Sequence, residues 1–170
     1  MNLASIQAVI ASAKARGEES LVKLIRESIP EATEEEVREA TITAVEIIDT
    51  IPVLMASAAH EADERNLTVV VQPVLDHAER YFLAPMDIMP EMTMGLAGLL
   101  DDAYLVLKVL ENLQKGPQPL LDWDLEYPIR FIRRLVGHKV GRQLDAVAMT
   151  AMHEISENVN QVWQLMSHRA

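Results

Sequence analysis

The sequence contains no cysteine among its 170 residues. This absence excludes disulfide bonds, thiolate metal ligands and a catalytic thiol, and it fits a reducing compartment such as the cytoplasm. Aromatic residues are also scarce, with two Trp, three Tyr and two Phe. We therefore expect a core of aliphatic side chains supplemented by the nine methionines, which adapt to irregular spaces.

Positive charge is in short supply, because 15 Lys and Arg face 26 Asp and Glu, for a net charge of −11. A field of this sign repels phosphate, so we expect no nucleic-acid partner. The N-terminus lacks the basic stretch and apolar run of a signal peptide. Uncharged runs such as 50–59 and 66–75 are shorter than the ~20 residues that span a membrane. We expect a cytoplasmic protein with one helical domain over residues 1–170.

Strand-like alternation is absent, and apolar residues recur at intervals of three and four almost throughout the chain. This periodicity predicts an all-α protein, an irregular bundle of about seven or eight helices. Proline and glycine punctuate the helical pattern. We place the breaks at Gly17, Pro30, Pro52, 66–68, 85–90, 116–128 and between Gly137 and Gly141.

Two local patterns support the helical interpretation. Thr33 and Glu36 have the spacing of a capping box, in which each side chain satisfies a backbone amide at the start of a helix. The last predicted helix, 142–166, carries a narrow apolar stripe at about 100° per residue. The stripe consists of Leu144, Ala148, Ala151, Ile155, Val159, Val162 and Met166.

One segment departs from the general pattern. It reads Pro85-Met86-Asp87-Ile88-Met89-Pro90-Glu91 and continues as Gly98-Leu99-Leu100-Asp101-Asp102. It resembles the signature of the YkvA-like family, a bacterial family of unknown function, in which a Pro-x-Asp-x-x-Pro-Asp turn precedes Gly-x-x-Asp-Asp and an apolar helix. The spacer is one residue longer here, and it lacks the second proline of the family pattern. The resemblance covers residues 81–110, and it implies a helical domain without implying an activity.

The motif has a structural and a functional interpretation. In the structural one, which we prefer, Asp87 accepts hydrogen bonds from its own turn, and the acids near the helix start favour the positive end of the helix dipole. In the functional one, carboxylates bind Mg²⁺ or Ca²⁺, with Asp101 and Asp102 as the candidate ligands and no cofactor otherwise expected. Helix angles place Asp101 opposite the apolar stripe and Asp102 at its edge. The candidate motif residues are Asp87, Pro90, Glu91, Gly98, Asp101 and Asp102.

The segment 129–142 is basic and contains no acidic residue. Such a segment suits an anionic lipid surface or an acidic partner, but we expect the carboxylates of 34–39 to neutralise it. Trp123 and Tyr127, in the loop before it, either cap the core or form an exposed edge for a partner. The candidate partner-binding residues are Arg130, Arg133, Arg134, Lys139, Arg142 and Trp123.

The preferred function from sequence is a non-catalytic helical interaction or scaffold module. Its partner is another protein or a second copy of the chain bound through the long C-terminal helix. The alternatives are an unknown activity at a carboxylate or divalent-metal site, composed of Asp87, Glu91, Asp101 and Asp102, and peripheral membrane association through 129–142. The sequence has no phosphate-binding glycine loop, dinucleotide fingerprint or nucleophile elbow. We expect His77, beside Asp76, to be structural or exposed.

Overall fold

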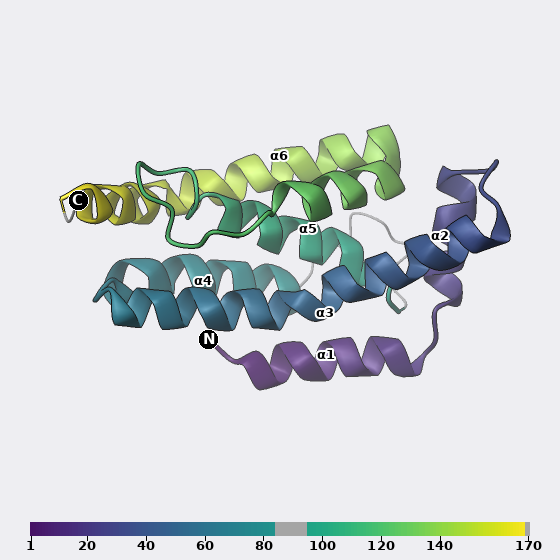
Figure 1. Ribbon diagram of the computed structural model, residues 1–170, viewed down its shortest axis with the longest axis horizontal. Helices are drawn as coiled ribbons and strands as arrows, with labels where there is room; N and C mark the ends of the chain where they lie inside the picture. The colour runs from purple at the N-terminus through teal and green to yellow at the C-terminus, as the bar shows by residue number, and fades with distance from the viewer. Residues whose placement is uncertain (84–94, 169–170) are drawn as a thin grey trace.

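A computed structural model describes residues 1–83 and 95–168. These residues form helices joined by loops, the longest described one over 112–125, without a strand, which confirms the all-α class. Figure 1 shows the helices packed side by side as an elongated bundle. The helices are α1 Leu3–Ala15, α2 Glu19–Ser28, α3 Glu34–Glu64, α4 Thr68–Leu83, α5 Gly98–Glu111 and α6 Glu126–Ser167.

The predicted number of helices was wrong, because the described residues form six rather than seven or eight. The break expected at Pro52 does not occur, and α3 continues through it for 31 residues. A proline inside a helix removes a hydrogen bond and costs about 3 kcal/mol. Ile48, Ile51 and Met55 lie on both sides of Pro52 and are fully buried. The burial of this continuous stripe outweighs the cost of the proline.

Two of the local patterns are confirmed. The Thr33 side chain accepts a hydrogen bond from the Glu36 amide at 3.2 Å, and the Glu36 carboxylate accepts one from the Thr33 amide at 2.7 Å. All seven residues of the predicted stripe in 142–166 are buried. Capping and stripe formation depend on residues within one or two turns, so the sequence predicts both.

Helix α5 lies at the centre of the bundle, in contact with α3, α4 and α6. Most of its residues from Leu99 to Leu110 are buried, on every side of the helix. A helix that is apolar around its whole circumference requires neighbours on all sides. The described residues accordingly share one hydrophobic core, to which all six helices contribute.

By length and composition alone, α3 could also cross a membrane, since an 18-residue window has a mean hydropathy of 1.6. The sequence analysis found no such segment because it considered uncharged runs, and α3 contains Glu46 and Asp49. In the bundle, Ile47, Ile48 and Ile51 of α3 belong to the hydrophobic core. The core helix of a bundle and a membrane-spanning helix both meet this criterion of length and hydropathy.

Helix α6 changes direction at Gly137, where φ is 76° and ψ is 178°. Glycine reaches this conformation because it has no Cβ. The two arms of α6, 126–136 and 138–167, run side by side in Figure 1. A straight helix would separate Arg133 from Asp145 by about 18 Å along its axis, whereas Arg133 Nη2 lies 3.2 Å from Asp145 Oδ2. The break predicted between Gly137 and Gly141 is therefore a turn within one element.

Arg133 bonds both sides of this turn. Its Nη1 donates to the carbonyl oxygen of Gly137 at 3.1 Å, and its Nη2 donates to Asp145 Oδ2. The other oxygen of Asp145 accepts from the hydroxyl of Tyr104 on α5, whose pKa is raised by burial and by this bond. A Cβ on Gly141 would lie 1.5 Å from Arg133 Nη1, so the guanidinium depends on glycine there. These five residues, which we call the Arg133 network, attach the turn to α5.

The Arg133 network predicts that the effect of Gly141→Ala on the free energy of unfolding changes sign when Arg133 is removed. Gly141→Ala should lower the free energy of unfolding by about 1–2 kcal/mol, because it displaces charge-assisted hydrogen bonds worth ~1.5–3 kcal/mol each. In an Arg133→Ala background, Gly141→Ala should instead stabilise the protein by about 1 kcal/mol through helix propensity. Urea unfolding of the four proteins measures both effects. Additive effects would show that Arg133 does not occupy the space beside Gly141.

Candidate functional site

The structure describes only the second half of the sequence motif. Gly98 is the first residue of α5, and Asp101 and Asp102 follow in its first turns. The motif residues Asp87, Pro90 and Glu91, together with Pro85, lie outside the described residues.

Asp101 lies opposite the apolar stripe, on the same helix face as Lys108, but it is buried there. Its residue is 5% exposed and that of Asp102 is 2% exposed. Further along the same face of α5, Lys108 is partly exposed, with 21% of its side-chain surface accessible. Asp101 Oδ1 accepts a hydrogen bond from the Asp102 amide at 3.0 Å, near the start of α5.

The metal hypothesis needs residues from both halves of the motif. Over residues 1–83 and 95–168, no three side chains of His, Asp or Glu are grouped closely enough to hold a metal ion. Asp101 and Asp102 supply two carboxylates, and the other proposed ligands, Asp87 and Glu91, are not described. The carboxylate site therefore stays a prediction.

The acidic start of α3 does not neutralise the basic segment as expected. Glu34 forms an ion pair with Arg26 of α2 at 2.7 Å. Glu35 pairs with Arg38 one turn along its own helix. Each of these two carboxylates thus pairs with a cation that is closer to it in the sequence than the segment 129–142. Such pairs form without bringing distant parts of the chain together.

The five cations of 129–142 fall into two groups. Arg130 is exposed and pairs with Glu126 at 3.0 Å, and Arg133 is half-buried in the Arg133 network. Arg134, Lys139 and Arg142 are exposed, and their side chains make no ion pair with the described residues. We call these three residues the tip cations, because they flank the Gly137 turn. Two of the five cations, Arg130 and Arg133, thus pair with acidic residues of the protein itself.

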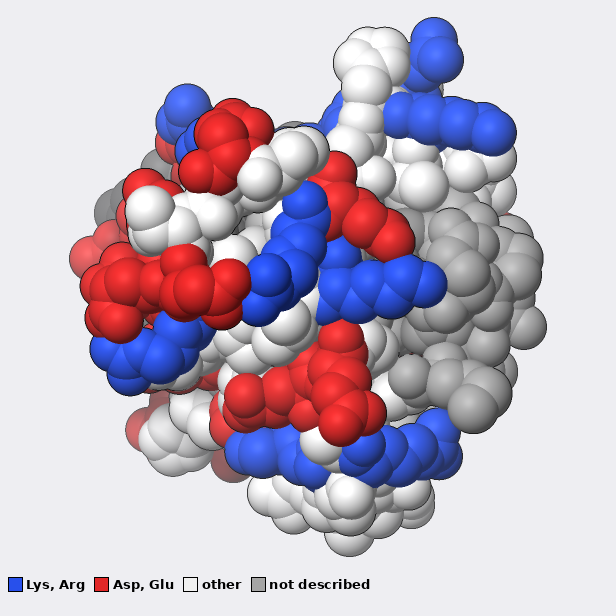
Figure 2. Space-filling model, turned by 90° about the vertical axis from the view of Figure 1, so that its right-hand side faces the viewer, with Lys and Arg blue, Asp and Glu red and all other residues white. Residues whose placement is uncertain are grey.

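Figure 2 views the molecule from the end that contains this turn. Blue side chains stand at the upper right of the picture, without red between them. The centre of the same face mixes blue with red. His138 is also exposed at this end, between the tip cations in sequence. The tip is therefore locally positive although the chain as a whole is acidic.

The outer side of the first arm of α6 joins aromatic and cationic side chains. Tyr127, Arg130, Phe131 and Arg134 follow the i, i+3, i+4, i+7 spacing of one helix face, which we call the arm face. The Tyr127 and Phe131 rings stack with centroids 6.3 Å apart, and Tyr127 is 59% exposed. A concavity of about 550 Å³ adjoins this face. Arg130, Arg134 and Tyr127 were singled out from the sequence, but their alignment with Phe131 on one helix face was not predicted.

Trp123 is packed partly into the core rather than forming an exposed edge. Its carbonyl oxygen accepts a hydrogen bond from Gln114 Nε2 at 2.9 Å, and the same amide donates to Leu121. The loop before α6 is thereby attached to the residues after α5. Of the two interpretations offered by the sequence, the core-capping one describes Trp123, and Tyr127 is the exposed aromatic residue of this region.

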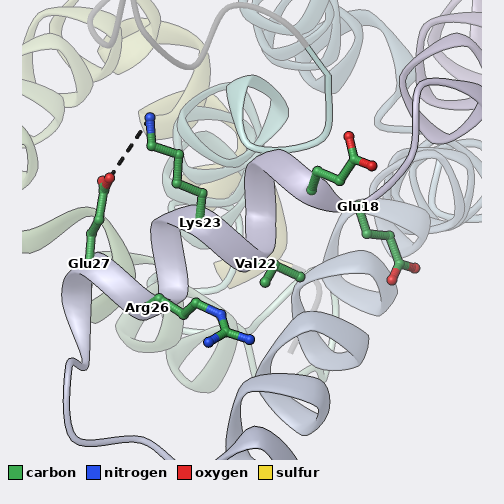
Figure 3. Close-up of a pocket in the computed structure, with 6 residues that line it drawn as sticks. Glu18, Val22, Lys23, Arg26 and Glu27 are labelled. Atoms are coloured by element: carbon green, nitrogen blue, oxygen red, sulfur yellow. Dashed lines mark ion pairs between the residues drawn. The ribbon is translucent and has the colours of Figure 1, made fainter.

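A second concavity, of about 540 Å³, runs along α2 and is shown in Figure 3. Its lining includes both cations of this helix, but each has an acidic partner. Lys23 Nζ lies 3.9 Å from Glu27 Oε1, drawn as a dashed line, and Arg26 pairs with Glu34. This surface carries no excess positive charge, unlike the tip.

His77 of α4 is buried, with 4% of its residue surface exposed, and it connects α4 to the second arm of α6. Arg80 Nη2 lies 2.9 Å from His77 Nδ1, and because a guanidinium can only donate, Nδ1 accepts. The neutral ring therefore carries its hydrogen on Nε2, which lies 3.2 Å from Glu154 Oε2. The edge of the ring contacts Tyr81. Burial, reinforced by Arg80 and opposed by Glu154, lowers the pKa of His77.

This lowered pKa predicts that acid destabilises the protein through His77. Between the ordinary histidine pKa of about 6.5 and the lower folded value, the unfolded chain binds a proton that the folded protein does not. The contribution of His77 to the free energy of unfolding should therefore fall as the pH drops below about 6.5. Urea unfolding of wild type and His77→Gln from pH 8 to 5 measures it. Parallel curves for the two proteins would contradict the expectation.

Comparison with known proteins gives one match. A family model described as "Protein of unknown function (DUF1232)" matches residues 80–107, which span the end of α4 and most of α5. This match falls on the segment that the motif singled out, and it carries no activity. No curated protein and no solved structure matches the chain.

Proposed function

We propose that the protein is a non-catalytic interaction module that binds an anionic partner through the tip cations and the arm face. The observation that carries the proposal is the exposure of Arg134, Lys139 and Arg142 without acidic partners among the described residues of a chain with a net charge of −11. A cation without a partner keeps its charge available for a ligand.

The total charge does not prevent such binding. Interactions between exposed charges are largely screened beyond about 10 Å at 0.1 M ionic strength. A partner at the tip therefore senses mainly the nearest side chains, and the segment 127–143 contains no acid. Two of the three tip cations are arginines, whose planar guanidinium groups bind carboxylate and phosphate oxygens in pairs.

The Arg133 network supports the same proposal, because it fixes the position of the surface. Arg133 bonds the carbonyl oxygen at the turn and reaches Asp145 on the other arm, and Asp145 in turn bonds Tyr104 in the core. The tip and the arm face are thus attached to the central helix. A preorganised surface loses less conformational entropy when a partner binds.

The proposal predicts retention on immobilised heparin at low salt, in spite of the acidic composition. Replacing all three tip cations by glutamine should abolish retention, because the remaining charges of the region are paired. The matched control replaces Lys23, Arg38 and Lys115, which have the acidic partners Glu27, Glu35 and Glu111. It has the same net charge as the tip variant and should elute close to wild type.

The salt concentration at which each protein elutes is the measured quantity, and circular dichroism checks that each is folded. Wild-type protein in the flow-through, or equal elution of the two variants, would refute the proposed function.

A further inference from the structure

The arm face combines two chemistries within about 10 Å, the length of seven residues of helix. The stacked rings of Tyr127 and Phe131 offer an apolar surface, and Arg130 and Arg134 lie beside them on the same face. Exposed tyrosine and arginine are the residues that most often dominate the energy of protein interfaces. A partner that uses the whole face must supply both an apolar group and negative charge.

The charge along this arm has a direction. Asp124 and Glu126 border the concavity at the start of the arm, and Glu126 already pairs with Arg130. Arg134 borders its other end without an acidic partner among the described residues, and the other tip cations lie beyond the turn. The negative charge of a partner is therefore favoured at the Arg134 end. Its apolar group is favoured over the rings.

The shape of the arm face distinguishes a peptide from a membrane. The concavity of about 550 Å³ has a size that accepts a large side chain. A flat bilayer does not enter a concavity, and an anionic bilayer close enough to contact the rings would also approach Asp124 and Glu126. An acidic peptide can place its charges at one end only, so it avoids this repulsion.

We infer, on the basis of the proposed function, that the partner is an acidic protein segment with a large apolar side chain that docks along the arm face. The apolar side chain occupies the concavity beside Tyr127 and Phe131. Acidic residues on one side of it bind Arg134 and the other tip cations. Complementarity of charge at one end and of apolar surface at the other fixes the orientation of the segment.

Selection from a random peptide display library on the full-length protein tests this inference. Selected peptides should combine acidic residues with a nearby aromatic or long aliphatic residue. Fluorescence anisotropy with the labelled peptides should show at least tenfold weaker binding to Arg134→Gln and to Tyr127→Ala. The controls Arg38→Gln and Met149→Ala alter an exposed cation and an exposed apolar residue outside the arm face, and they should bind like wild type.

The outcomes separate this inference from the proposed function. Selected peptides without acidic residues, or with affinities that both arm-face variants leave unchanged, would overturn the inference. Co-sedimentation with phosphatidylserine vesicles that needs the tip cations, without binding of any acidic peptide, would replace the peptide by a membrane and leave the proposed function standing. If the wild-type protein bound neither heparin nor vesicles nor peptides, both the proposed function and this inference would be refuted.

Discussion

The guanidinium of Arg133 is the group on which the surface of α6 depends. It bonds the carbonyl oxygen at the turn and the carboxylate of Asp145. Without these bonds, the carbonyl oxygen of Gly137 would lose its donor and the carboxylate of Asp145 would lose its cation. The segment 129–142 thus uses Arg133 for folding, pairs Arg130 with Glu126, and leaves its other three cations for solvent or a partner.

Much of the fold follows from short-range patterns in the sequence. The capping box at Thr33 and the stripe from Leu144 to Met166 depend on spacing within one helix, and both are present. The continuation of α3 through Pro52 was missed because the local cost of proline is visible in a sequence, whereas the burial of Ile48 and Ile51 against other helices is not. Burial is a property of the whole bundle.

The candidate site shows the same limit. Helix angles place Asp101 opposite the apolar stripe, but they do not show that the bundle buries Asp101 and leaves Lys108 on the same face partly exposed. The ion pairs of 129–142 were also predicted wrongly. The sequence shows the number of carboxylates, but it does not show which cation lies close to each of them. Arg26 and Arg38 bind the acids at the start of α3. The arm face itself could have been read from the spacing of Tyr127, Arg130, Phe131 and Arg134.

The central position of α5 has a consequence for how the bundle comes apart. Its neighbours α3 and α4 precede it in the chain, and α6 follows it. Detaching either half of the protein would therefore expose apolar surface of the same central helix to water. The N-terminal and C-terminal halves are coupled through this shared surface, so the amides of α5 should exchange with solvent only in the global unfolding event.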